Sequence, residues 1–317
     1  MPGELANSVR AAAPADADAA IARLVMRLST EYVLRRLQLL IDTYGDIRAG
    51  VLVQAINFAN VDYTDARDEE VRRAAGAAGV FPDEMRRPVS VARLADAAGL
   101  PFENVRRVVQ QLIVAGLIKR IPGGVIVPRS TFERPENLRA VLVNVTYVRT
   151  LMRDLQAAGL VSHVPACLAA AAREDGTWIA RLVIRLSSQY FLRALQLHAD
   201  IFGDVRAGIV AQTIISANTA YLDTRSGEGW RYAGIDLPLP DDARRPISVN
   251  SIAGSLGLPY ETVRRRVDRL LEAKLCARAP GGVIVPAAIL DSPSAVRAVL
   301  SNVGYVRKFA RDLDAIL

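Results

Sequence analysis

Arginine pairs are the residues with the clearest chemistry in this sequence, and they recur at one fixed spacing. Arg86-Arg87 returns 158 positions later as Arg244-Arg245, and Arg106-Arg107 returns at the same distance as Arg264-Arg265. A guanidinium group can bind a phosphate or a guanine edge through two parallel hydrogen bonds. Arginines that are clustered twice in this way therefore indicate recognition of a polyanion.

The net charge is concentrated around these pairs. The chain of 317 residues has a formal charge of +7, whereas residues 86–120 carry seven basic and two acidic side chains and residues 244–278 carry eight and three. Each stretch is thus +5, which leaves about −3 for the rest of the chain. A charged run is often only a solvated surface. Because this excess occurs twice at the same place, we favour a phosphate-binding surface, with double-stranded DNA as the partner.

Two short helices are expected to position the arginines. In the second copy, apolar residues at helical spacing predict a helix over Val249–Leu256, and Pro259 suits the first turn of the next helix. This next helix has one apolar stripe, formed by Val263, Val267, Leu270, Leu271 and Leu275. Arg264, Arg265 and Arg269 lie off the stripe, so we expect them on the exposed surface.

A hairpin is expected after the basic helix, because the strand-like runs Cys276–Ala279 and Val283–Val285 are joined by a Pro-Gly-Gly turn. The order of helix, turn, basic helix and hairpin resembles a winged helix-turn-helix. It is similar to bacterial transcriptional regulators of the GntR, MarR and IclR kinds. The resemblance covers Arg86–Pro128 and Arg244–Pro286. It implies that the N-terminal part of the basic helix enters the major groove of DNA.

The resemblance and the charge together define candidate DNA contacts. The groove-facing positions are Phe102, Glu103, Asn104, Arg106 and Arg107 in the first copy, and Tyr260, Glu261, Thr262, Arg264, Arg265 and Arg269 in the second. The expected backbone contacts are Arg86, Arg87, Arg244 and Arg245, with Ser90 and Ser248 beside them, and Lys119, Arg120 and Arg278 on the hairpins.

Structural roles compete with DNA contact at several of these positions. Glu103 and Glu261 are equally compatible with accepting a hydrogen bond from cytosine and with a favourable place at a helix N-terminus. Ser90 and Ser248 fit helix N-caps better than phosphate contacts. The segment 122–124 lacks the Gly-Lys-Ser/Thr ending of a phosphate-binding loop, so we interpret it as a hairpin turn.

The whole arrangement is duplicated. Adding 158 to any position from Ile21 to Leu155 reaches its counterpart without a gap, and about half of roughly 140 aligned positions are identical. The sequence therefore predicts a first unit at 16–158, a linker at 159–176 and a second unit at 177–317.

Long helices flank the module in each repeat. In the first repeat, the apolar periodicity predicts helices over Asp16–Tyr44, Ile47–Asn60 and Pro135–Ala158, with Asp46 as an N-cap. The remaining segments, Met1–Ala15, Asp62–Met85 and Arg129–Arg134, are expected to be an arm and two connections. This plan is similar to that of the MarR kind of regulator, which implies a pseudo-two-fold dimer within one chain. Two half-sites about 34 Å apart are then expected on the DNA.

The two copies differ at positions expected to face the groove. Asn104 becomes Thr262 and Gln111 becomes Arg269, while Val108 becomes Arg266, which we expect to be only partly exposed. Such differences predict two related but non-identical half-sites, or one dominant and one supporting contact.

Polar residues also recur within the flanking helices. They are Gln38, Gln54, Asn60, Asn144 and Tyr147, with Gln196, Gln212, Asn218, Asn302 and Tyr305 as counterparts. A small-molecule pocket between the helices is one interpretation. The other, which we favour, is that these groups satisfy one another or a buried backbone carbonyl. The sequence identifies no effector.

Other classes of protein lack the residues they need. The two cysteines lie 109 positions apart, and neither they nor the two histidines have metal-ligand spacing. The sequence also lacks a nucleotide-binding glycine loop and a Ser-His-Asp set, so we expect no enzyme, metal or cofactor. It contains no uninterrupted apolar run of membrane-spanning length and no signal pattern. We therefore expect a cytoplasmic, nucleoid-associated protein without membrane contact.

The sequence thus predicts a mainly α fold with two tandem winged helix-turn-helix units and short two-stranded β-wings. The expected function is sequence-specific binding of double-stranded DNA in transcription regulation. The alternative is a winged-helix protein–protein assembly factor or a nucleoid protein of low specificity, because winged helices occur both in DNA-binding and in protein-binding proteins. Association of two chains into a homodimer is compatible with either function.

Overall fold

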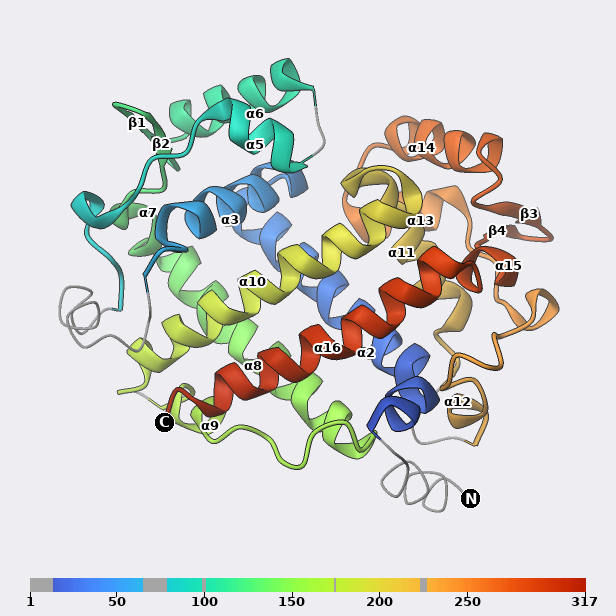
Figure 1. Cartoon of the computed structure of the whole chain (residues 1–317). Helices are drawn as coiled ribbons and strands as arrows, with labels where there is room; N and C mark the ends of the chain where they lie inside the picture. Colours follow the sequence, from blue (N-terminus) through green and yellow to red (C-terminus); the bar gives the residue numbers. More distant parts are fainter. Residues whose placement is uncertain (1–13, 65–78, 99–100, 174, 223–226) are drawn as a thin grey trace. The chain divides into compact units, whose positions relative to one another are not determined.

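The computed structural model describes residues 14–64, 79–98, 101–173, 175–222 and 227–317. Within these residues the fold is mainly α, with two small antiparallel sheets of two strands each (Figure 1). The mainly α class expected from the sequence is confirmed. Residues 1–13 of the expected arm and 65–78 of the expected connection lie outside the described residues.

The chain packs into two compact units that do not coincide with the two sequence repeats. The first-module unit comprises Arg35–Arg149, Pro165–Leu192 and Phe309–Leu317, and the second-module unit comprises the described parts of Met1–Leu34, Thr150–Val164 and Arg193–Lys308. Each unit contains one of the two arginine-rich modules, Arg86–Pro128 or Arg244–Pro286. The boundary of each unit falls inside long helices, whereas the expected boundaries followed the repeats at 16–158 and 177–317.

Capped helices lead into each module at the positions that the sequence predicts. Helix α2 spans Pro14–Tyr44 and α3 spans Ile47–Val61, and in the second repeat α10 spans Thr177–Phe202 and α11 spans Val205–Thr219. Asp46 accepts a hydrogen bond from the backbone nitrogen of Arg48 over 2.7 Å, which caps α3. Asp204 caps α11 in the same way through Ala207, over 2.8 Å.

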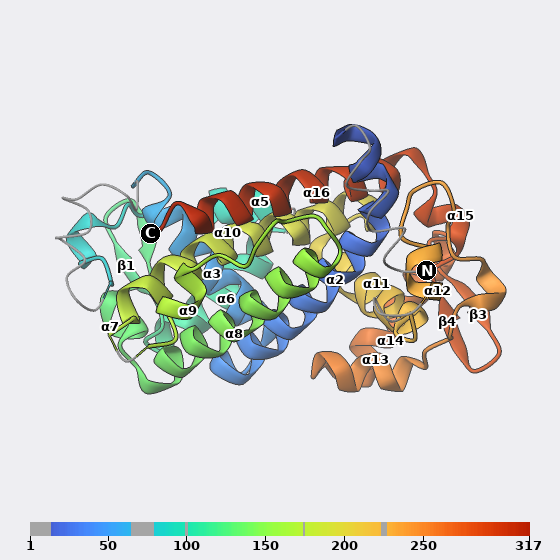
Figure 2. The same ribbon diagram turned by 90° about the horizontal axis from the view of Figure 1, so that it is seen from below.

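Two helices and a hairpin make up each module. The first module contains α5 (Val91–Ala98), α6 (Phe102–Val114), β1 (Lys119–Ile121) and β2 (Gly124–Ile126). The second contains α13 (Val249–Leu256), α14 (Tyr260–Glu272), β3 (Ala277–Ala279) and β4 (Gly282–Ile284). Helix α11 packs against α13, α14 and β4, and these elements lie together in both views (Figures 1 and 2). The helices and strands expected in the second module agree with the structure to within a few residues, except that Leu275 lies beyond the end of α14.

Glycine is required at the hairpin turn because another backbone passes close to it. Val89 forms an isolated antiparallel bridge with Val125, which brings the Val89 carbonyl beside Gly124. A Cβ atom on Gly124 would lie 2.2 Å from that oxygen, and its φ is +150°. Gly282 has the same 2.2 Å approach to the oxygen of Ile247. The interpretation of this segment as turn chemistry is therefore confirmed.

The two repeats contribute together to each compact unit. In the first-module unit, Asn144 Nδ2 donates to Ser187 Oγ over 2.9 Å. In the second-module unit, Asn302 Nδ2 donates to Ser29 Oγ over 2.9 Å. Asn144 and Asn302 are counterparts, as are Ser29 and Ser187, so the same contact occurs twice with the repeats exchanged. These buried bonds explain why two asparagines recur inside otherwise apolar helices.

Several short helices lie in segments that were expected from the sequence to be connections. Helix α7 (Arg129–Phe132) occupies the expected connection before α8 (Pro135–Ala157), and α15 (Ala287–Leu290) precedes α16 (Pro293–Asp314). The expected linker contains α9 (Cys167–Ala170), in which Cys167 and Leu168 are buried. The remaining short helices are η1 (Asp83–Met85), α12 (Gly227–Arg231) and η2 (Asp241–Ala243). No described helix has both the length and the apolar character to cross a membrane.

Candidate nucleic-acid interface

Exposed basic side chains gather on one helix and one hairpin of each module. We call the set Arg87, Arg106, Arg107, Lys119 and Arg120 the first-module basic surface, and the set Arg245, Arg264, Arg265, Arg269 and Arg278 the second-module basic surface. All ten side chains are exposed. They account for half of the positions expected from the sequence to contact DNA.

The apolar stripe of each basic helix determines which residues face outward. In α14, Val263, Val267 and Leu270 are buried, each at most 2% exposed. Their spacing of three to four residues places them on one side of the helix, so the arginines occupy the opposite side. In α6 the corresponding buried residues are Val105 and Val109, followed by Leu112. The exposed position predicted for the helix arginines is therefore confirmed.

Carboxylates within the same helices hold two of these arginines. Arg106 Nε donates to Glu103 Oε2 over 2.8 Å. Arg264 donates to Glu261 over 2.9 Å and to Asp268 over 3.0 Å. Hydrogen bonding from Arg264 lowers the pKa of the Glu261 carboxyl below its usual value. Exposed pairs of this kind contribute little to stability, so a phosphate could replace the carboxylate at small cost.

Other arginines of α14 line a surface hollow of about 270 Å³ together with Glu261 and Thr262. The side chains of Arg265 and Arg269 have no hydrogen-bond or ion-pair partner among the described residues, whereas Arg266 Nη1 donates to Asp204 Oδ2 over 2.8 Å. The Arg266 side chain is 18% exposed, which agrees with its expected partial exposure. The first module has Arg107, Val108 and Gln111 at the corresponding positions, so this surface of α14 has two more arginines than the corresponding surface of α6.

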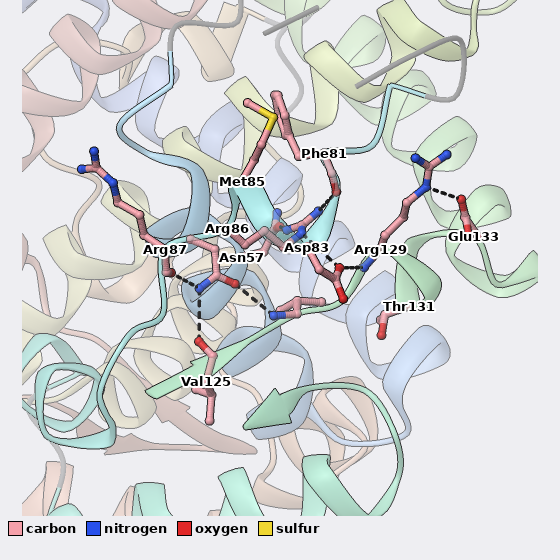
Figure 3. Close-up of polar contacts among 12 residues, drawn as sticks. Asn57, Phe81, Asp83, Met85, Arg86, Arg87, Val125, Arg129, Thr131 and Glu133 are labelled. Atoms are coloured by element: carbon pink, nitrogen blue, oxygen red, sulfur yellow. Dashed lines mark hydrogen bonds and ion pairs between the residues drawn. The ribbon is translucent and has the colours of Figure 1, made fainter. Parts of the chain in front are cut away.

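Arg86 is not available for the phosphate contact that the sequence suggests. It is only 4% exposed, and its guanidinium donates to Asn57 Oδ1 over 3.0 Å and to the Phe81 carbonyl over 3.2 Å. Its guanidinium carbon lies 5.0 Å from the centroid of the Phe132 ring. Burial lowers the pKa of Arg86 to about 10, which leaves it charged at pH 7. Figure 3 shows Arg86 among Phe81, Asn57 and Asp83, with Arg87 extending away from them.

Arg244 requires the same correction. It is 5% exposed and donates to the Leu239 carbonyl over 2.7 Å and to Asp241 over 3.3 Å. Arg86 and Arg244 are therefore structural residues. An Arg-Arg pair in extended backbone points its two side chains in opposite directions, so only one of the pair can face solvent. This alternation of side chains is the feature of the sequence that could have predicted one buried and one exposed arginine in each pair.

Arg87 and Arg245 do occupy exposed positions, and each stacks on a tyrosine. The guanidinium carbon of Arg87 lies 3.8 Å from the centroid of the Tyr63 ring, and that of Arg245 lies 4.4 Å from that of Tyr221. Such stacking restricts an otherwise flexible side chain and is worth about 0.5–1 kcal/mol at exposed sites. These tyrosines were not among the candidates expected from the sequence, although they recur at the same spacing of 158 residues.

A repeated asparagine fixes the backbone beneath each stacked arginine. Asn60 Nδ2 donates to the Arg87 carbonyl over 2.7 Å and to the Val125 carbonyl over 3.2 Å, and its Oδ1 accepts from the Val127 nitrogen over 2.9 Å. Asn218 makes the corresponding three bonds in the second module. The interpretation that these asparagines satisfy buried backbone groups is confirmed. In each module these hydrogen bonds connect the helix that carries the asparagine (α3 or α11) to the segment of the stacked arginine and to the hairpin.

The other candidates are two N-capping serines, two exposed aromatic residues, two polar residues of the basic helices and the hairpin cations. Ser90 accepts from the Arg93 nitrogen and Ser248 from the Ser251 nitrogen, over 3.2 and 3.1 Å, so both are N-caps as expected. Phe102 and Tyr260, at the first position of each basic helix, are both 47% exposed. Asn104 accepts from Arg107 over 3.4 Å, and Thr262 is exposed. The hairpin residues Lys119, Arg120 and Arg278 are also exposed.

The two thiols are poorly suited to covalent chemistry. Cys167 and Cys276 are buried, and desolvation raises the pKa of each to about 12. Both thiols are therefore protonated and weakly nucleophilic at pH 7. Among the described residues, no cluster of histidine, cysteine and carboxylate side chains has the composition of a metal site.

Comparisons of the chain with protein-family models, curated proteins and solved structures give no match. The functional assignment therefore rests on the residues and their geometry alone.

Proposed function

We propose that the protein is a sequence-specific double-stranded-DNA-binding regulator of transcription, and that each module is a winged helix-turn-helix. In this proposal α6 and α14 enter major grooves, and the hairpins β1–β2 and β3–β4 follow the neighbouring phosphate backbone. The observation that carries it is the outward face of α14, where Arg264, Arg265 and Arg269 are all exposed.

The division between base and phosphate contacts follows from how firmly each arginine is held. Arg87 and Arg245 are restrained by their tyrosines, so they suit positioning contacts to phosphates. Arg265 and Arg269 have no partner among the described residues and are free to adopt the bidentate geometry that guanine requires. Arg264 is paired with Glu261 and Asp268, and these ion pairs must break before it can contact DNA. Its contact with DNA therefore requires acceptors that bind the guanidinium more strongly than these carboxylates do.

The two modules are proposed to contribute unequally. The second-module basic surface has Arg269 where the first module has Gln111, and Arg265 faces a hollow that Arg266 also lines. Asp268 offsets part of this charge, because it pairs with Arg264 and lies 3.8 Å from Arg278. We therefore expect the second module to make the dominant contact and the first to support it.

Protein–protein assembly is the alternative that one observation favours. Phe102 and Tyr260 are large, nearly half exposed and placed at the start of the basic helices. Exposed aromatic residues are enriched in protein interfaces. In the DNA proposal the same rings contact thymine methyl groups or sugars beside the arginines. The greater number of arginines around them supports DNA over protein.

A gel-shift experiment separates the two functions. The purified chain is mixed with genomic DNA fragments and an excess of poly(dI-dC). A regulator retains a subset of fragments, and this subset is lost when Arg107 and Arg265 are both changed to alanine. A low-specificity nucleoid protein is displaced from all fragments by the competitor, and an assembly factor shifts none of them.

A further inference from the structure

The second-module unit contains a cavity whose counterpart in the first-module unit is almost filled. The cavity in the second-module unit has a volume of about 630 Å³ and is lined by residues that include Arg23, Arg27 and Arg244. The counterpart, which has Arg181, Arg185 and Arg86 at the equivalent positions, has a volume of about 80 Å³. Ligand-binding cavities typically measure about 300–1,000 Å³, so only the former is large enough for an organic molecule.

Replacements of large by small side chains account for the difference. In the first-module unit, Tyr44 donates from its hydroxyl to Asn137 Oδ1 over 2.7 Å, and both residues line the small cavity. Their counterparts Phe202 and Ala295 lack this bond and line the large one. Phe132 likewise becomes the smaller Leu290.

A further replacement removes a buried cation. Arg36 lines the small cavity, is 1% exposed and donates to Gln54. Its counterpart is Ala194. Gln212, the counterpart of Gln54, is fully buried and has no hydrogen-bond partner among the described residues. The second-module unit therefore lacks the hydrogen bond between Arg36 and Gln54 that occurs in the first-module unit. The smaller Ala194 side chain leaves space near Arg23, Arg27 and Arg244.

Arg244 is left with an unused donor beside the enlarged cavity. In the first-module unit, Arg86 Nη1 donates to Asn57 Oδ1 over 3.0 Å. The counterpart of Asn57 is Ile215, which cannot accept a hydrogen bond and which also lines the cavity. Arg244 Nη1 is buried without a partner in the described structure. An unpaired buried guanidinium donor is costly, and a bound anion would satisfy it.

Two further arginines line the cavity beside Arg244. Arg23 lines it: its Nη2 pairs with Asp291 Oδ1 over 2.7 Å, while its Nε is buried without a partner among the described residues. Arg27 donates to the backbone carbonyls of Tyr232 and Gly229 over 2.8 and 2.7 Å. Both acceptors are uncharged, so neither bond neutralises the guanidinium charge. The lining includes three arginines and two carboxylates, Glu31 and Asp154, and Arg23 and Arg244 are also paired with Asp291 and Asp241.

We propose that this cavity binds a small organic carboxylate with an apolar body. The carboxylate accepts hydrogen bonds from Arg244 Nη1 and the neighbouring arginines, which present the planar donor geometry that a carboxylate matches. The apolar body packs against Met26, Ile201, Phe202, Ile215 and Leu239, all of which line the cavity. His198 also lines it, and burial lowers the pKa of its ring, which keeps the ring neutral at pH 7.

Isothermal titration calorimetry on the full chain, without DNA, tests this proposal independently of the proposed function. The probes are octanoate and 3-phenylpropanoate, each paired with its uncharged amide. The expected result is one saturable site per chain for at least one carboxylate, with its amide bound at least about tenfold more weakly, since a hydrogen bond to a charged group is lost. Absence of saturable binding by both carboxylates, or equal binding of acid and amide, overturns the proposal.

Two variants locate the site. Ile215→Asn supplies the acceptor that Asn57 provides in the other unit, so it should occupy Arg244 Nη1 and weaken the carboxylate about tenfold. The double variant Phe202→Tyr with Ala295→Asn rebuilds the pair that fills the small cavity, and it should abolish binding. Thermal unfolding of each variant confirms that it is folded.

A surface variant excludes adventitious binding to exposed arginines. Arg265→Ala removes a guanidinium from the hollow on α14 and should leave carboxylate binding unchanged. If Arg265→Ala weakens the carboxylate while Ile215→Asn and the double variant do not, the anion binds at the module surface and the cavity proposal is wrong.

Discussion

At the scale of single residues, the arginines include three classes that the sequence does not distinguish. Arg86 and Arg244 are buried and hold the module to its neighbours. Arg106 and Arg264 are exposed but paired with carboxylates of their own helix. Arg265 is exposed and has no partner among the described residues. The difference lies in the local geometry, so an arginine count alone overstates the number of groups that can meet a phosphate.

The unpaired class should matter most for DNA binding. Arg265→Ala is expected to weaken binding by about 1–3 kcal/mol and to relax specificity at one base pair if the contact is to a base. A phosphate contact would instead weaken all sequences alike and reduce the salt dependence of the affinity by about one ion. Fluorescence anisotropy with a selected duplex and a scrambled one, at several salt concentrations, measures both. Arg311→Ala, which removes an exposed arginine of α16 outside the basic surfaces, is the control and should have no effect.

Asp268 should oppose DNA binding. It pairs with Arg264 and lies near Arg278, and the first module has Gln110 in its place. Asp268→Gln removes a negative charge that would face phosphates, so binding should tighten by about 0.5–1 kcal/mol, the scale of an exposed ion pair. The same anisotropy measurement detects this. Weaker binding by the variant would show that Asp268 contributes a favourable contact of its own.

At the scale of elements, a buried asparagine holds each module together. Asn218 donates to two carbonyls and accepts from the Val285 nitrogen, and Asn60 does the same in the first module. The helix boundaries and the hairpins were predictable from apolar spacing, capping residues and glycines, because these signals are local. Helix α7 and the packing of α9 were not, because four-residue helices carry too little periodicity to be recognised.

Asn218→Ala tests the importance of this asparagine. Removal of its amide leaves three buried backbone groups without their partner, so the free energy of unfolding should fall by about 2–4 kcal/mol. Urea unfolding followed by circular dichroism measures the loss, and Asn60→Ala should behave similarly. Asn250→Ala, on the exposed face of α13, is the matched control and should change stability by less than about 0.5 kcal/mol. An equal effect of all three variants would remove the proposed structural role.

At the scale of the whole molecule, the compact units differ from the repeats that build them. The sequence identifies the duplication without ambiguity, yet it does not reveal that each unit takes helices from both repeats. That exchange depends on contacts between residues far apart in the chain, such as Asn302 with Ser29, which no local pattern encodes. The enlarged cavity was equally hidden, because it arises from small changes at several distant positions.

Separate expression of the repeats tests this exchange. Residues 1–158 and 159–317 as two chains should combine in a one-to-one complex, because each unit needs helices from both. Either half alone should be unfolded or should pair with itself through the same contacts. Sedimentation and circular dichroism on the single and mixed chains measure this. A folded monomer of one half, with native helix content, would contradict the account.

Selection of bound sequences from a random duplex library shows whether the two basic helices read DNA. We expect an enriched motif for the wild-type chain at physiological salt, and loss of that motif when Arg107 and Arg265 are both replaced by alanine. A library that emerges without enrichment, or a motif that survives this double substitution unchanged, would show that the basic faces of α6 and α14 do not read DNA.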